Sequence, residues 1–360
     1  RGWHAECLTL ARDARGKHPE SAQFALLWGY SAMNGDAEGE LYEAATEGIA
    51  SNSELTPTWH WLLAQLYSHQ GEADNAIAAL DTLLASETEA WNARKMRAGL
   101  YRRQGVLAMA LTDLDVITAA GQADTTVHWE RIGVATRLGR WRQCRESALA
   151  NGIELTKPEQ PGDPIDERWE DCLIAYEGPD GQQLTVLAER TGPVTARLEQ
   201  IPQPKHPRRL GDVVIFDPAP NNAPPDEDAT EEERNAHLFE YAYVDLLEAG
   251  IWQGYELDGV HPGETVLDSL RAELEARHCI LSVRSDERYT LEVDGDDILG
   301  IYAYIAVPET VSARDISICL ADILGACHAP LVWTTLAIDG ADSTRAVEHA
   351  GLAKAFQLDA

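Results

Sequence analysis

The residues best suited to metal binding or proton transfer lie in one short segment, 258–264 (DGVHPGE), whose polar members are Asp258, His261 and Glu264. An imidazole and two carboxylates are ligand types that divalent metals take, and the same groups can act as acid and base at a scissile bond. A structural interpretation competes, because His-Pro-Gly is common turn chemistry and Glu264 suits the first turn of a helix. Since no local motif adds a second His or Asp, we favour the structural interpretation and predict no catalytic residue, no metal and no cofactor.

The rest of the sequence lacks the local signatures of common enzymes. It contains no glycine-rich phosphate loop, GxSxG elbow, HExxH helix or paired Cys clusters. The basic segment 205–209 (KHPRR) could hold a phosphate, but a solvated loop between two strands is the favoured interpretation. An enzyme with an unrecognised catalytic site in residues 166–360 therefore stays as an alternative, while the sequence leans toward a protein that is not an enzyme.

A second set of side chains combines cations with aromatic and polar groups at helical spacing. Its members are Trp61, Gln65, His69, Lys95, Arg102 and Arg103. Positions four or seven apart share one face of a helix, so two successive helices would each present part of this set. Lys and Arg pair with peptide carboxylates, and Trp supplies apolar contact. The competing interpretation is a solvated helix face, on which charged side chains commonly lie.

The two segments that carry this set repeat one another at a spacing of 34 residues. Ala64, Tyr67, Gly71, Ala76 and Leu80 recur in register as Ala98, Tyr101, Gly105, Ala110 and Leu114. A small residue and a Tyr three positions later lie on one face of a first helix, Gly opens a tight turn, and Ala lets a second helix pack closely. With this period and punctuation, residues 1–154 resemble the tetratricopeptide repeat (TPR) family.

The resemblance implies stacked helical hairpins with a concave groove lined by the first helix of each hairpin, and it implies protein binding. We therefore predict an interaction scaffold or adaptor whose groove binds an acidic or C-terminal peptide segment of a partner through the six side chains named above. Gly2, Trp3 and Cys7 echo the same residue types near 139–144, which indicates that the sequence opens inside a hairpin and that further repeats precede it.

Composition excludes two classes of protein. The 360 residues are 44% hydrophobic and include ten Trp, which argues against a mostly disordered chain. No apolar run approaches the roughly 20 residues that span a bilayer, so we predict no membrane partner. Six Cys without a Cys-x-x-Cys pair favour a reducing compartment over a disulfide framework or a zinc site. We accordingly predict a cytoplasmic location.

The net charge of −31 is distributed unevenly. Residues 1–150 hold 14 Lys and Arg against 19 Asp and Glu, whereas residues 151–360 hold 15 against 41. Such acidity repels phosphate backbones, so we predict no direct nucleic-acid binding. The acidic half could serve solubility, dock a basic partner, or mimic nucleic acid. We favour solubility, because net charge bears on solubility and association rather than on fold.

The run at 155–165, rich in Pro, Gly and charge, cannot continue a helix and predicts a linker. Short β-branched segments follow it and predict a β-rich subdomain at 166–225, an antiparallel sheet or partly closed barrel. Its expected strands are 172–176, 184–190, 194–201 and 212–216. An α+β subdomain is expected at 226–360. Its expected elements are a helix at 232–248, a strand at 255–257, a helix at 264–277, a hairpin of 280–284 with 289–293, a strand at 300–307, a helix at 313–324, a strand at 331–338 and a helix from Ser343.

The expected fold class of the whole chain is therefore α+β. An N-terminal α-solenoid of TPR hairpins precedes an acidic α+β domain with a mainly antiparallel sheet.

Overall fold

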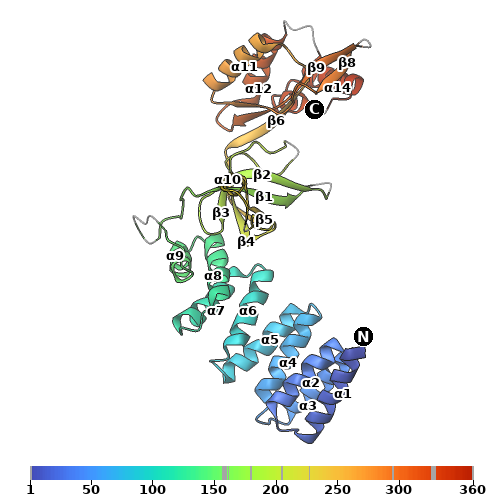
Figure 1. Cartoon of the computed structure of the whole chain (residues 1–360), viewed down its shortest axis with the longest axis vertical. Helices are drawn as coiled ribbons and strands as arrows, with labels where there is room; N and C mark the ends of the chain where they lie inside the picture. The colour runs from blue at the N-terminus through green and yellow to red at the C-terminus, as the bar shows by residue number, and fades with distance from the viewer. Residues whose placement is uncertain are drawn as a thin grey trace. The chain divides into compact units, whose positions relative to one another are not determined.

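The computed structural model describes residues 2–155, 160, 162–178, 181–203, 206–226, 228–293, 296–325 and 330–358. Contacts divide the chain into two compact units, Arg1–Pro164 and Ile165–Ala360, and the division falls inside the predicted linker. A run of helices precedes mostly antiparallel sheets, which confirms the α+β layout (Figure 1). Some expectations lie outside the described residues: most of the linker run 156–161, Pro179 and Asp180 of the first β-turn, Lys205, Glu227 and Cys327.

The first unit is helical throughout its described elements. Their bounds are α1 Gly2–Lys17, α2 Ala22–Asn34, α3 Glu38–Ala50, α4 Thr56–His69, α5 Ala73–Ser86, α6 Trp91–Arg103, α7 Leu107–Ala119, α8 Thr125–Arg137 and α9 Trp141–Ala150. Each helix packs mainly against its neighbours in sequence, and Leu41, Leu62 and Leu80 are fully buried between them. None of the helices in the described part of the chain is both long and apolar enough to cross a bilayer.

Three turns repeat one backbone geometry at the 34-residue spacing. Gly71, Gly105 and Gly139, which follow α4, α6 and α8, have φ angles of 78°, 76° and 62°. This left-handed region suits glycine because glycine has no Cβ to clash there. The sequence period is therefore also a period of the backbone.

Ion pairs between successive helices repeat at the same spacing. Arg97 on α6 donates to Asp81 on α5 with an Nη1–Oδ1 distance of 2.5 Å, and Arg131 on α8 donates to Asp115 on α7 with an Nε–Oδ1 distance of 2.7 Å. Donor and acceptor are each shifted by 34 residues from one pair to the next. Because bonded guanidinium groups fix both distance and orientation, the pairs hold consecutive hairpins in one repeated arrangement.

One tight contact in this unit allows a stability prediction. A methyl group at Gly48 on α3 would overlap the indole of Trp59 on α4, and that indole is 4% exposed. Because the buried ring has little room to move, Gly48→Ala is expected to lower the free energy of unfolding by about 1–3 kcal/mol. Gly39 on the same helix has open space at its Cβ position, so Gly39→Ala is expected to raise stability by about 0.5 kcal/mol. Urea unfolding of both variants checks this, and equal shifts would contradict the packing described.

The second unit begins with a closed barrel of five strands. They are β1 Asp171–Glu177, β2 Gln183–Arg190, β3 Thr195–Leu198, β4 Val213–Pro220 and β5 Glu240–Glu248. Neighbouring strands are antiparallel except for β5 and β1, which pair in parallel and close the barrel. Ile174, Val214 and Phe216 are among the side chains buried inside it. Closure leaves no unpaired strand edge among these five strands.

The rest of the unit is an antiparallel sheet packed against helices. Its strands are β6 Trp252–Val260, β7 Ile280–Val283, β8 Thr290–Val293, β9 Asp296–Pro308 and β10 Leu331–Val332, and its helices are α11 Glu264–Ala276, α12 Ala313–Leu324, α13 Thr334–Asp339 and α14 Ser343–Phe356. The strand order is β10-β6-β9-β7, with β8 also paired to β9. Leu257, Ile301 and Ile305 share one buried core with Leu270 and Leu320 of the helices.

The helix predicted at 232–248 is wrong beyond its first turns. A short helix, α10 Glu231–Ala236, is closed at its start by a capping box between Thr230 and Glu233, and Glu240–Glu248 is then strand β5. Tyr241 and Tyr243 alternate with other residues along the strand, and its backbone pairs with both β1 and β4. The subdomain boundary predicted at 225/226 is consequently wrong too, because β5 completes the barrel.

Two expectations in the last sheet are also wrong. The segments predicted as a hairpin, at 280–284 and 289–293, pair with opposite ends of the long strand β9 instead of with each other. The strand predicted at 331–338 ends after two residues, and Thr334 begins α13, which buries Leu336 and Ala337. A short apolar run does not distinguish strand from helix by its pattern alone.

Two buried histidines in the second unit make its stability depend on pH. Burial lowers the pKa of His206 to about 4 and that of His349 to about 4, while an unfolded His titrates near 6.5. Between these values the unfolded chain binds more protons, so stability falls as pH drops from about 6.5 to about 4, on the order of 3 kcal/mol per histidine. Urea unfolding from pH 7 to 4.5 should show this loss. It should be smaller in His349→Gln and unchanged in His278→Asn, whose His is exposed.

Candidate functional site

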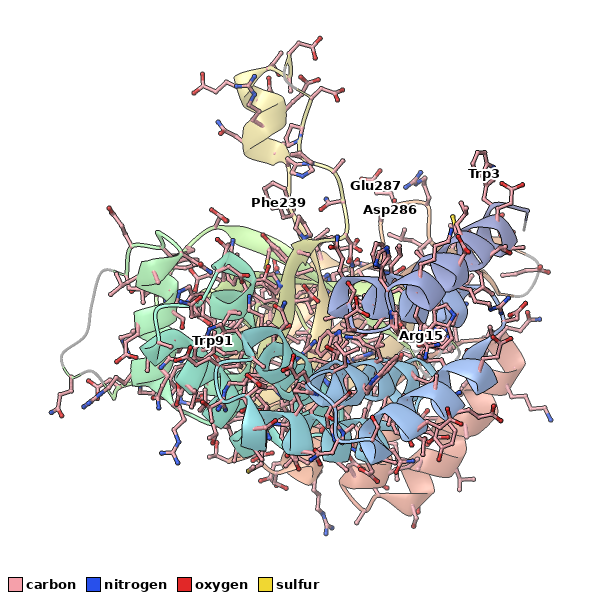
Figure 2. All side chains as sticks on the ribbon, turned by 90° about the horizontal axis from the view of Figure 1, so that it is seen from below. Trp3, Arg15, Trp91, Phe239, Asp286 and Glu287 are labelled. Carbon is pink, nitrogen blue, oxygen red and sulfur yellow. The ribbon has the colours of Figure 1, made fainter. Side chains whose placement is uncertain are left out.

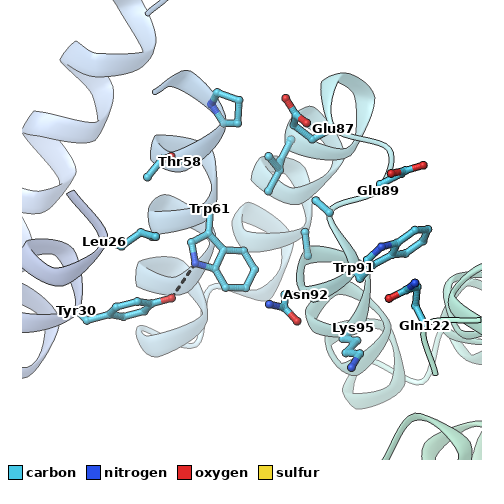
Figure 3. A pocket seen from close by; sticks show the side chains of 14 residues that line it. Leu26, Tyr30, Thr58, Trp61, Glu87, Glu89, Trp91, Asn92, Lys95 and Gln122 are labelled. Carbon is cyan, nitrogen blue, oxygen red and sulfur yellow. Dashed lines mark hydrogen bonds between the residues drawn. The ribbon is translucent and has the colours of Figure 1, made fainter. Parts of the chain in front are cut away.

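A hollow of about 720 Å³ lies on the helical unit, between the first helices of successive hairpins (Figure 3). It is lined by Leu26, Tyr30, Pro57, Thr58, Trp61, Leu83, Glu87, Glu89, Ala90, Trp91, Asn92, Ala93, Lys95 and Gln122. Its volume is within the range of ligand pockets, roughly 300–1,000 Å³. Three aromatic side chains, from α2, α4 and α6, dominate the lining.

The repeat explains why these helices contribute the same positions. Pro57, Thr58 and Trp61 on α4 correspond at a spacing of 34 to Trp91, Asn92 and Lys95 on α6. On α2 the spacing is 31, so Leu26 and Tyr30 correspond to Pro57 and Trp61. Because equivalent positions face the same way in stacked repeats, one face of three helices forms a continuous wall.

Trp61 is held in place by its neighbour. Its indole Nε1 donates a hydrogen bond of 2.8 Å to the Tyr30 hydroxyl, so the polar edge of the ring is satisfied within the chain (Figure 3). The half-buried ring stays available to an apolar group from outside. A rigid aromatic surface of this kind binds apolar side chains with little entropy cost to the protein.

The charge of the hollow is mixed. Lys95 is the cation among the described lining residues, and its ammonium bonds to Asp124 at 2.7 Å. This bond, with the backbone N–H of Val127, lowers the pKa of Asp124, which also caps the start of α8. Glu87 and Glu89 are exposed carboxylates on the same lining. The prediction of a basic groove is therefore wrong for this hollow.

The six predicted contact residues separate into two groups. Trp61 and Lys95 line the hollow, as the helical face predicted. Gln65 donates its side-chain amide to the Met96 sulfur at 3.3 Å and does not line the hollow.

The other three predicted residues lie elsewhere. His69 lies 3.4 Å from the Glu38 carboxylate of α3, beside a separate hollow formed by α3, α4 and α5. Arg102 and Arg103 are exposed in the last turn of α6 and are absent from the lining. Following one helical face to its C-terminal end carried the prediction beyond the hollow.

Sequence reasoning missed the lining residues Tyr30 and Trp91. Tyr30 was overlooked because the spacing between α2 and α4 is 31 rather than 34, so a strict 34-residue register does not align it with Trp61. Trp91 corresponds to Pro57 at the full spacing, and this alignment could have revealed it.

The structure does not assemble the predicted chemical cluster at 258–264. Asp258 is 1% exposed and accepts a 2.7 Å hydrogen bond from the Tyr289 hydroxyl. His261 Nδ1 accepts from the backbone N–H of Gly263, and its Nε2 lies 3.6 Å from Glu264 at the start of α11. Over the described ranges, no three His, Cys, Asp or Glu side chains are grouped so that they could hold a metal ion.

A buried polar cluster that the sequence did not predict surrounds Asp258. Glu256, two residues before it on the same face of β6, is 3% exposed and accepts a 3.1 Å hydrogen bond from the Tyr302 hydroxyl of β9. Burial raises the pKa of Tyr302 well above its usual value, so the phenol stays a donor. The cluster explains how two carboxylates are accommodated in the sheet.

No protein-family model matches this chain, and no match is found among curated proteins. Among solved structures it is similar to a hypothetical protein from Neisseria gonorrhoeae, at 13% sequence identity and a TM-score of 0.25, over 45% of this chain and 92% of that chain. A resemblance this weak carries no argument, so the case for a function rests on the geometry of the chain itself.

Proposed function

We propose that the helical unit is a solenoid of the TPR type and acts as an interaction scaffold, with the C-terminal segment of a partner protein bound in the aromatic hollow. The register of the lining carries this proposal: Tyr30, Trp61 and Lys95 occupy equivalent positions on three successive first helices. The repeated glycine turns and the repeated Arg–Asp pairs support the same reading of the helices.

The aromatic lining selects an apolar anchor. Trp61 and Trp91 stand on neighbouring first helices, and Leu26 and Leu83 add aliphatic surface between and beside them. A bulky apolar side chain of the ligand would gain contact with several of these groups at once. Burial of such a side chain contributes about 1.5–3 kcal/mol, which is enough to anchor a peptide.

The charges select a single carboxylate rather than an acidic run. Lys95 can exchange its bond to the exposed Asp124 for a bond to a ligand carboxylate. Glu87 and Glu89 on the same lining repel further negative charge. Between the two ligand classes that the sequence left open, a C-terminal carboxylate fits this arrangement better than an acidic segment.

Selection from a library of random peptides with free C-termini tests the proposal on the full chain. We expect enrichment of peptides with a bulky apolar residue close to the C-terminal carboxylate, and weaker binding when that carboxylate is amidated. The same library is screened against Trp61→Ala and against Trp3→Ala, whose ring projects from α1 and is 81% exposed (Figure 2). Equal enrichment on wild type and Trp61→Ala would reject the proposal.

A further inference from the structure

A second cavity lies in the C-terminal unit, where the segment between β3 and β4 meets strand β6. It has a volume of about 160 Å³, and its polar lining comes from His206, Arg208, Arg209, Gln253 and Gly254. This volume is well below the roughly 300 Å³ at which ligand pockets usually begin. The cavity therefore suits one small chemical group.

His206 points to the kind of group that would fit. The residue is 8% exposed, and its ring stacks on Tyr176 with 3.8 Å between ring centroids. Its Nδ1 accepts a 3.1 Å hydrogen bond from the backbone N–H of Arg208. In the neutral ring the proton is therefore on Nε2.

The Nε2–H of His206 is buried and has no acceptor among the described residues. An unsatisfied buried donor costs about 1–3 kcal/mol. An acceptor supplied by a ligand in the cavity would remove that cost.

The two arginines bring positive charge to the same cavity. The Arg208 guanidinium lies 4.9 Å from the centroid of the Tyr243 ring, and no carboxylate in the described ranges forms an ion pair with it. Arg209 bonds to Glu309 at 2.5 Å, but both side chains are more than a third exposed and the pair can open. Positive charge is thus concentrated here although the half of the chain that contains it is strongly acidic.

We propose that this cavity binds a single phosphate group, with His206 Nε2–H and the Arg208 guanidinium as its donors. Guanidinium forms paired, charge-assisted hydrogen bonds with phosphate oxygens, and a tetrahedral oxyanion has further oxygens left for the imidazole donor. The site is separate from the aromatic hollow and does not depend on its function. The phosphate group can belong to inorganic phosphate or to a phosphorylated molecule.

Isothermal titration of the full chain with sodium phosphate, against sodium chloride at equal ionic strength, tests this site. We expect saturable binding of phosphate, at least a tenfold loss of affinity in Arg208→Gln, and unchanged affinity in Arg288→Gln, whose side chain is 90% exposed. His206→Phe keeps a ring against Tyr176 and removes the donor, so it should also weaken binding several-fold. Circular dichroism establishes that the variants are folded.

A parallel titration with phosphoserine distinguishes the two sources of the phosphate group. Tighter binding of phosphoserine indicates a phosphorylated side chain as the ligand, and tighter binding of inorganic phosphate indicates the free anion; either supports the site. Heat indistinguishable from the chloride control overturns the proposal. Wild-type affinity in folded Arg208→Gln and in folded His206→Phe overturns it as well.

Discussion

Asp113→Ala is expected to lower the free energy of unfolding of the helical unit by about 3–5 kcal/mol, the cost of removing one partner from a buried charge cluster. Asp113 is 2% exposed and accepts hydrogen bonds from Arg97 at 2.7 and 2.8 Å and from Arg94 at 3.3 Å. The bond to Asp113 is the main reason that the pKa of Arg97 is raised, so this guanidinium stays charged when its partner is lost. Two largely buried cations would then face one another.

The matched control is Asp81→Ala. Asp81 also bonds to Arg97, but its side chain is 52% exposed, so its removal should cost less than about 1 kcal/mol. Urea unfolding followed by circular dichroism at pH 7 measures both variants. Equal losses for Asp113→Ala and Asp81→Ala would contradict the burial and bonding described here.

Trp61→Ala is expected to weaken binding of a selected C-terminal peptide by about 2 kcal/mol, roughly 30-fold. The indole forms the centre of the aromatic lining, and its hydrogen bond to Tyr30 keeps it in one orientation before a ligand arrives. Trp3→Ala removes the same residue type from an exposed position and should leave the affinity unchanged. Peptide fluorescence anisotropy with the full chain measures all three affinities. A loss shared by the two variants would mean that Trp61 does not contact the peptide.

A charge reversal separates the carboxylate from the apolar anchor. Lys95→Glu should weaken the free-acid peptide at least tenfold and have little effect on its amidated form. Arg142→Glu makes the same charge change at an exposed position on α9, away from the lining. Parallel losses for both peptides in Lys95→Glu would indicate long-range repulsion rather than a direct bond to the carboxylate.

Local patterns predicted much of the fold. The helix expected at 313–324 is α12 Ala313–Leu324, and the strand expected at 184–190 lies within β2 Gln183–Arg190. These elements have their apolar period and their end signals within a few residues. Strand β5 was missed because its pairing partner β1 lies about 70 residues earlier in the chain, and no local pattern signals a parallel closure.

The candidate site was predicted in part for a related reason. Trp61 and Lys95 belong to the repeat in register, so helical spacing alone placed them on one face. Tyr30 required the shorter spacing of the preceding hairpin, and Glu87 and Glu89 lie after α5 in a connection whose path depends on packing. The sign of the local charge follows from that path, which is why the expected basic groove is an aromatic hollow with mixed charge.

Site-specific photo-crosslinking tests the central claim most directly. A selected C-terminal peptide carries a photoreactive phenylalanine analogue in place of its apolar anchor and is irradiated with the full chain, and the adducts are mapped by mass spectrometry. The account predicts adducts concentrated in the segments 26–30, 57–61 and 87–95, and their loss when unlabelled peptide competes. Competable adducts on the outer helices α3 and α5 or within Ile165–Ala360, with none in these three segments, would contradict it.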